Sequence, residues 1–322
     1  MDNSSVRKKH NFLYRKKQVL LITILLIVLI VVSTLLDRVF FSVENFSNLM
    51  TTSLPFIFVS FAQMLVIMTG GIDLSVGSII SLSNVLCAVL MINKPFGFVF
   101  GLIVALAAGA AAGFISGILV AKGKLQPIIV TLATSSVYLG IALWVLPTPG
   151  GLVHPGFARA MDSDIAGIPV ALIIGILITC IMFFLVFRTK FGNSVLAIGG
   201  NEGSAFSSGI QVNKVKIITY TLTGILSSIA GIFLATQMYS GDPAVGKNFT
   251  MQSITITVIG GTSLAGGKGS VLGIISGVFI LVIINNILNL VGLNTFYQFI
   301  FQGCILIFAL GVSSFKLKYT AA

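Results

Sequence analysis

Asp73 is the only charged residue between Glu44 and Lys94, and it lies within a string rich in glycine and serine. A carboxylate in such apolar sequence must be hydrogen-bonded, paired or hydrated. The preceding glycine pair is typical of a helix end, and Asp73 or Ser75 can accept hydrogen bonds from the N–H groups that open the next helix. The spacing favours a structural cap, and a direct contact to a solute is the alternative. The string comprises Gly70, Gly71, Asp73, Ser75, Gly77 and Ser78.

A second group of residues with clear local chemistry lies at 199–210, in a long polar connection. Asn201 is a good N-cap, Glu202 complements the helix dipole and Gly209 is the expected C-cap, so the pattern predicts a short helix. Phe206 is then an apolar knob on an exposed helix, which indicates a docking element. A helix lying flat on a membrane, with Phe206 in lipid, is the alternative. The docking residues are Gly200, Asn201, Glu202, Gly203, Ser204, Ala205, Phe206 and Gly209.

Uncharged polar side chains recur inside apolar runs. Asn285 shares a helix face with Asn289, and Gln298 shares one with Gln302, because each pair has the spacing i, i+4. Amides and hydroxyls that face a pathway suit a neutral, hydroxyl-rich solute better than an ion, and hydrogen bonding between helices explains them equally well. The candidate pathway residues are Gln63, Asn84, Thr131, Thr134, Asn285, Asn289, Gln298 and Gln302.

Other chemistry is not indicated by the sequence. The segment 261–270 resembles a phosphate-binding loop but carries Thr262 and Gly269 where that motif needs glycine and a hydroxyl residue. No nucleophilic triad, paired carboxylates or metal-ligand spacing is visible, and Cys87, Cys180 and Cys304 lie far apart in apolar segments. We therefore expect no catalytic centre, no metal site and no cofactor in this chain.

The elements that must position these residues are membrane helices. The chain has 322 residues, of which 56% are hydrophobic and 8% charged, and its mean hydropathy is +1.08. Such a composition indicates an all-α polytopic membrane protein. Reading the apolar runs predicts about ten spans: 18–36, 51–69, 75–92, 97–121, 128–146, 168–187, 217–237, 251–265, 270–290 and 295–313.

The basic residues predict the orientation of these spans. With the N-terminus inside, only Arg38, Lys94, Arg159 and Lys247 fall outside, and the remaining Lys and Arg of the 19 fall on the cytoplasmic side. Both termini are then cytoplasmic. This scattered placement also argues against nucleic acid as a partner. The predicted parts are a basic tail (1–17), one transmembrane domain (18–313) with an irregular outer loop (147–167) and an inner loop (188–216), and a second tail (314–322).

Small residues recur at helical spacing at Ala105, Gly109, Gly113 and Gly117, and again at Gly273 and Gly277. They predict close helix packing within one chain, with a dimer seam as the alternative. The string at 70–78 also echoes the string at 260–270, which suggests a parallel internal repeat.

Three ordered motifs resemble the bacterial ABC sugar-import permeases of the ribose type. They are the string from Thr69 to Ser78, the inner-loop segment from Phe191 to Ile210, and the segment from Val258 to Ser270. The third motif contains Gly260, Gly261, Gly266, Gly267 and Gly269. The resemblance covers roughly residues 45–312. The chain departs from the family pattern at Ser204-Ala205, where two alanines are usual, and at Leu139-Gly140, where Arg-Gly is usual.

The resemblance implies a permease in the bacterial cytoplasmic membrane that works as a dimer of two copies or with a paralogue. A cytoplasmic ABC ATPase subunit holds ATP and magnesium, and an extracytoplasmic solute-binding protein delivers the sugar. By resemblance, Asn201 to Gly209 is the coupling helix that contacts the ATPase, and the outer loop receives the binding protein.

Alternative substrates and functions remain at this point. Permeases for branched-chain amino acids, nucleosides or furanone signals share the architecture. An ion-coupled secondary transporter needs titratable groups deep in the bundle, and Asp73 is the only candidate. A scaffolding membrane protein does not need a capped, apolar-tipped helix in its inner loop.

Overall fold

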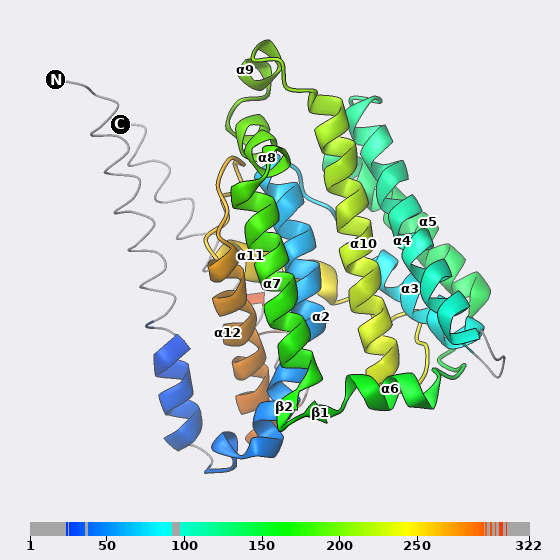
Figure 1. Ribbon diagram of the computed structural model, residues 1–322, viewed down its shortest axis with the longest axis vertical. Helices are drawn as coiled ribbons and strands as arrows, with labels where there is room; N and C mark the ends of the chain where they lie inside the picture. Colours follow the sequence, from blue (N-terminus) through cyan, green and yellow to red (C-terminus); the bar gives the residue numbers. More distant parts are fainter. Residues whose placement is uncertain are drawn as a thin grey trace.

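The computed structural model describes residues 26–35, 38–91 and 97–292, with a few single residues at 24 and within 294–307. The chain in these ranges is almost entirely helical, as predicted, and Figure 1 shows the helices side by side in one bundle. The elements are η1 (Arg38–Phe41), α2 (Val43–Met68), α3 (Val76–Leu90), α4 (Gly97–Ala121), α5 (Pro127–Val145), α6 (Pro155–Met161), β1 (Asp164–Ile165), β2 (Ile168–Pro169), α7 (Val170–Arg188), α8 (Lys190–Gly200), α9 (Glu202–Ser207), α10 (Val212–Met238), α11 (Phe249–Ile259) and α12 (Val271–Leu290).

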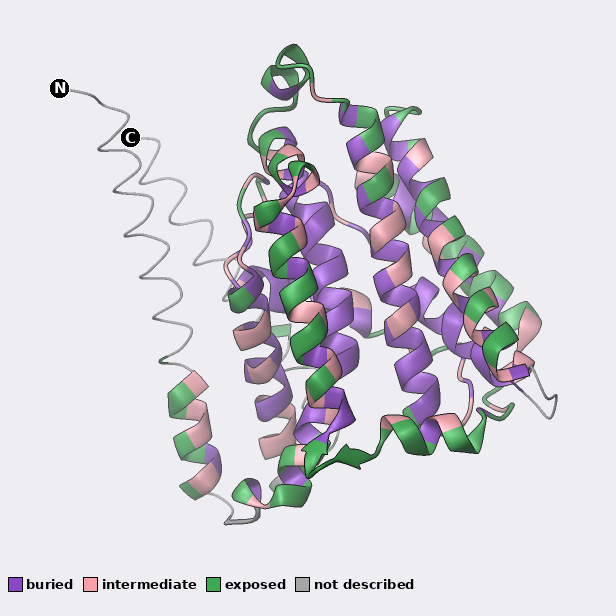
Figure 2. Cartoon of the chain, viewed as in Figure 1, coloured by how far each residue is buried: buried purple, intermediate pink, exposed green. Residues whose placement is uncertain are grey.

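Helices α2 and α10 form the centre of the bundle (Figure 2). Every residue of α2 from Ser53 to Met68 is buried. On the other side of α10, Gly109, Gly113 and Gly117 of α4 lie against its backbone, and a Cβ at Gly113 would overlap the carbonyl oxygen of Tyr220. The small-residue pattern therefore serves packing within the chain, because it lets two backbones approach closely.

The outer surface of the bundle is apolar. Large side chains such as Phe100 of α4, Trp144 of α5 and Phe184 of α7 are exposed. Among the described residues, six helices are long and apolar enough to cross a membrane: α2, α4, α5, α7, α10 and α12. Only a bilayer makes such a surface favourable on so many helices at once.

Two predicted spans are shorter than expected. Helix α3 has 15 residues and α11 has 11, which gives lengths of about 22 and 16 Å against a hydrocarbon layer of about 30 Å. The first is shorter because the chain at 69–75 is non-helical and Met91 ends the helix, and the second because Gly260 and Gly261 end the helix early. The span predicted at 18–36 is described in part, as a helix at 26–35. The span predicted at 295–313 lies largely outside the described residues, and the tails at 1–17 and 314–322 lie wholly outside them.

The two long loops lie at opposite ends of the bundle (Figure 1). Helices α8 and α9 occupy one end, which we call the α9 end, and α6 with the β1–β2 hairpin occupies the other, which we call the α6 end. The expectation of an irregular outer loop is corrected, because Pro155 opens α6 and a turn at Ala166 and Gly167 closes an antiparallel hairpin. The main chain of Gly150 also pairs with that of Gly241, at 2.9 and 2.7 Å.

Candidate functional site

Helix α9 has the caps that the sequence predicts. The side-chain Oδ1 of Asn201 accepts the N–H of Ser204 at 2.7 Å. At the other end, the N–H of Gly209 bonds the carbonyl of Phe206 at 2.9 Å and the N–H of Ile210 bonds that of Ala205 at 3.1 Å. These two bonds form a Schellman motif, so both helix ends are satisfied locally.

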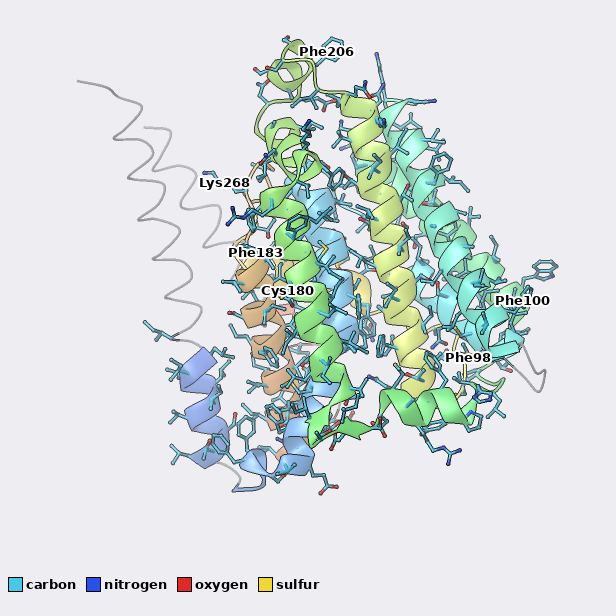
Figure 3. All side chains as sticks on the ribbon, viewed as in Figure 1. Phe98, Phe100, Cys180, Phe183, Phe206 and Lys268 are labelled. Atoms are coloured by element: carbon cyan, nitrogen blue, oxygen red, sulfur yellow. The ribbon has the colours of Figure 1, made fainter. Side chains whose placement is uncertain are left out.

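The surface of α9 is polar apart from one large apolar side chain. Phe206 is 71% exposed and stands at the tip of the α9 end in Figure 3. Ala205, on the opposite side of the helix, is buried. The helix therefore presents a single aromatic side chain away from the bundle, as expected of a docking element.

One ion pair ties α9 to the membrane bundle. Lys216, near the start of α10, places its Nζ 2.7 Å from Oε2 of Glu202. Glu202 is largely exposed, so the pair stabilises the fold only weakly and acts chiefly to set the position of α9. The sequence analysis missed Lys216, because its partner lies on a different helix and no spacing rule connects them.

Glycines from all three sequence motifs lie together where α8 leads into α9. A Cβ at Gly199, near the end of α8, would overlap the carbonyl oxygen of Met68 at the end of α2. The N–H of Gly267 bonds that same carbonyl at 3.0 Å, and a Cβ at Gly266 would lie 2.7 Å from the oxygen of Gly199. Main-chain atoms of three segments are thus in direct contact, and we call this contact the glycine junction.

The two echoing strings share a local structure. Gly70 and Gly261 both have positive φ, of 85° and 84°, and both follow the last turn of a helix. In each case the following residue, Gly71 or Thr262, donates its N–H to a carbonyl five residues earlier, at 3.2 and 3.1 Å. The strings are therefore equivalent helix ends, which is a local similarity and not evidence for a longer repeat.

Asp73 lies in the irregular segment between α2 and α3. The carboxylate is fully buried, and its Oδ1 accepts the backbone N–H of Ser75 at 2.7 Å and the Ser75 hydroxyl at 2.6 Å. Leu74 donates its N–H to Thr131 of α5 at 3.0 Å. The segment thus packs against α5, in keeping with the full burial of Asp73.

The starts of α3 and α11 are hydrogen-bonded to each other. The N–H of Gly77 donates to Oγ1 of Thr250 at 3.2 Å, and the N–H of Gly246, just before α11, donates to Oγ of Ser81 at 3.0 Å. Ser75, in contrast, makes no capping bond with its side chain. The sequence predicts that Asp73 or Ser75 accepts the N–H groups at the start of α3. One of them, the N–H of Gly77, is instead bonded by Thr250 of α11.

The predicted pathway residues separate into distinct groups. Asn84 donates to the carbonyl of Gly231 at 3.3 Å and accepts the N–H of Asp242 at 2.7 Å, while Thr131 and Thr134 are hydrogen-bonded around α5. Asn285 and Asn289 also have partners. Gln298 and Gln302 lie outside the described residues. Of the predicted pathway residues that the structure describes, only Gln63 is buried without a hydrogen-bond partner.

Comparisons with known proteins agree with these motifs. Residues 45–310 match the protein family described as branched-chain amino acid transport system / permease component. The chain is 39% identical over 254 residues to the ribose import permease protein RbsC of Bacillus subtilis, covering 78% of this chain and 79% of that relative. It is 35% identical over 292 residues to RbsC of Escherichia coli K12, covering 88% and 90%.

A relative named for another sugar is nearly as similar. The D-allose transport system permease protein AlsC of Escherichia coli K12 is 32% identical over 276 residues, covering 85% of this chain and 84% of that protein. No solved structure matches the chain.

Proposed function

The chain belongs to the family of branched-chain amino acid transport system permease components, and we propose that it is the membrane-spanning subunit of an ABC importer that takes up a sugar. The relatives above are named for ribose and allose, and another for L-arabinose. A pentose or hexose is therefore the proposed substrate. Nucleosides, branched-chain amino acids and furanone signals are the alternatives.

The single observation that carries the proposal is α9 with its exposed Phe206. An importer of this class needs a contact through which a separate ATPase drives the membrane helices. Helix α9 is capped at both ends, tied to α10 by Lys216 and rooted on the glycine junction. A force on Phe206 therefore reaches the end of α2 and the loop between α11 and α12 through main-chain contacts that side-chain motion cannot absorb.

The distribution of charge supports a cytoplasmic α9 end. Helices α4 and α7 end there, and α10 begins there, with seven basic residues at or near those helix ends and in the loop after α11. Cytoplasmic loops carry such an excess of Lys and Arg. The residues are Lys122, Lys124, Arg188, Lys190, Lys214, Lys216 and Lys268.

The opposite face then points outward, and α6 with the β1–β2 hairpin forms the surface for the solute-binding protein. The hairpin exposes Ile165 and Ile168, and α6 exposes Arg159. We also propose a second permease copy or a paralogue, because one ATPase contact on each subunit gives a symmetric complex. The ion-coupled alternative has little support, because Asp73 uses Oδ1 as a cap for the segment before α3.

The test is co-purification with the candidate ATPase, followed by ATP hydrolysis in liposomes with and without sugar-loaded binding protein. We expect the binding protein to stimulate hydrolysis. Phe206→Asp should weaken ATPase association at least about fivefold, because an exposed aromatic anchor is typically worth more than about 1 kcal/mol in an interface.

The matched control is Ile165→Asp, which replaces an exposed apolar residue with the same charge at the α6 end. It should leave ATPase association unchanged. Equal association of the Phe206→Asp variant and the unaltered chain would show that α9 is not the docking element.

A further inference from the structure

Three buried polar side chains at the centre of the bundle have no hydrogen-bond partner among the described residues. Gln63 and Ser60 lie on α2 and Ser227 lies on α10, and all three are fully buried. Both amide atoms of Gln63 and both hydroxyl oxygens are unpaired. Burying such groups without partners is unfavourable, so their presence at the core calls for a reason beyond packing.

The contacts between α2 and α10 place Ser60 and Ser227 at one level, and Gln63 lies about one turn after Ser60 on α2. Thr223 of α10 donates its hydroxyl to the carbonyl of Ala62 at 3.1 Å, and the rings of Phe58 and Phe233 stack at 5.8 Å. These two contacts bracket both serines. Ser227 is one turn after Thr223 on the same face of α10, and Ser60 lies between Phe58 and Ala62.

Helix α11 reaches the same level from another side. Thr257 donates its hydroxyl to the carbonyl of Ser60 at 3.3 Å. Helix α3 packs against α10 one turn further on, where a Cβ at Gly231 would overlap the carbonyl of Ile80. Both are the short, interrupted helices of the bundle. Transport proteins commonly place a solute site where interrupted helices meet near the middle of the membrane.

The chemistry of this cluster suits an uncharged ligand. The helices α2, α3, α10, α11 and α12 carry charged residues only near their ends, at Glu44, Lys214 and Lys216. An amide offers two donors and an acceptor, and each hydroxyl offers one donor and an acceptor. That set matches the adjacent hydroxyl groups of a sugar, each of which also donates and accepts.

Helices α2 and α10 can separate around Gln63, Ser60 and Ser227 with the loss of few side-chain hydrogen bonds. Among the described residues, side chains make only two hydrogen bonds between α2 and α10: Thr223 to Ala62, and Gln237 to the carbonyl of Thr51 at 2.8 Å. None joins Gln63, Ser60 and Ser227 to one another. Separating the helices at this level therefore exposes three polar groups without breaking a bond that they make.

We propose that Gln63, Ser60 and Ser227 form a contact site for the hydroxyl groups of a neutral sugar as it crosses the bundle. The inference rests on the proposed function, and it adds the residues that touch the solute. In the closed bundle the three groups lack partners because their partner is the passing sugar. The site combines one predicted pathway residue with two serines that the sequence analysis missed, since buried serines in apolar helices usually bond their own backbone.

The experiment measures uptake of radiolabelled D-ribose, D-allose and L-arabinose by liposomes that contain the permease, its ATPase and the binding protein. Gln63→Met keeps the length of the side chain and removes its hydrogen bonding. We expect its uptake at low sugar concentration to fall about tenfold or more, because a site built for hydroxyl groups loses much when its polar contacts are removed. Ser227→Ala should act in the same direction, by roughly threefold to tenfold.

Thermal unfolding separates a ligand contact from a structural role. Gln63→Met should leave the unfolding temperature unchanged or raise it, because a thioether replaces a buried, unpaired amide. Asn84→Leu, in contrast, should lower it, because both groups of that amide are bonded. Gln126→Met, the same substitution at an exposed glutamine whose side chain makes no capping bond, should leave uptake unchanged.

Normal uptake by Gln63→Met and Ser227→Ala overturns the site while the proposed function stands. If uptake falls only in proportion to the loss of stability or of assembled complex, the residues have a structural role, and this result also overturns the site. An unaltered complex that hydrolyses ATP but imports none of the three sugars contradicts the proposed function, and the site with it.

Discussion

The two carboxylate oxygens of Asp73 have different environments. Oδ1 holds the backbone and the hydroxyl of Ser75, whereas Oδ2 is buried without a partner among the described residues. An asparagine can reproduce the first set of contacts, because its side-chain carbonyl also accepts hydrogen bonds. The charge is therefore not needed for the cap, and removing it relieves the cost of burying it.

We predict that Asp73→Asn keeps sugar uptake within about threefold of the unaltered protein, while Asp73→Ala loses both bonds and lowers the unfolding temperature by a few degrees. Uptake in liposomes and thermal unfolding in detergent measure the two effects. A stable, assembled Asp73→Asn protein without uptake would instead assign a direct transport role to the carboxylate.

At the level of elements, the sequence predicts what depends on neighbouring residues. The bounds of α9 follow from Asn201 and Gly209, since caps act within a few positions. The glycine junction could not be predicted, because Met68, Gly199 and Gly267 are distant in sequence and interact through backbone atoms that carry no side-chain signal. The lengths of α3 and α11 were overestimated because hydropathy does not show where an apolar segment stops being helical.

The glycine junction predicts that substitution by alanine is much more damaging at Gly199 than at Gly200. Gly199→Ala forces a methyl group into the carbonyl of Met68 and should lower the unfolding temperature by about 5 °C or more, with loss of sugar-stimulated hydrolysis. Gly200→Ala is the control, because a Cβ there meets nothing within 4 Å. Equal behaviour of the two variants would show that the backbone contact is not tight.

For the whole molecule, the separation of the α9 end from the α6 end fixes how the chain must lie in the membrane. The exposed apolar faces of α4, α5 and α7 require lipid between the two ends. The basic residues at the α9 end support the proposed orientation, with that end in the cytoplasm. Composition predicts the membrane helices well, because hydropathy acts over long segments and does not depend on detailed packing, whereas the orientation stays a prediction from charge.

Cysteine labelling tests that orientation. In a background where Cys180 and Cys304 are replaced by alanine, Asp162→Cys should react with a membrane-impermeant maleimide in intact cells. Ser207→Cys should react only after the membrane is opened. Both positions are exposed, so access across the membrane is the only expected difference. The reverse pattern would place α9 outside and exclude a cytoplasmic ATPase contact there.

The reciprocal bonds at the starts of α3 and α11 have a consequence for biosynthesis. Gly77 depends on Thr250, and Gly246 depends on Ser81. While the ribosome has made only the first half of the chain, α3 therefore has an open end inside the lipid, where an unpaired N–H is costly. The start of α3 therefore gains these hydrogen bonds only after α11 is synthesised. A truncated chain that ends before α11 leaves the N–H of Gly77 without Thr250.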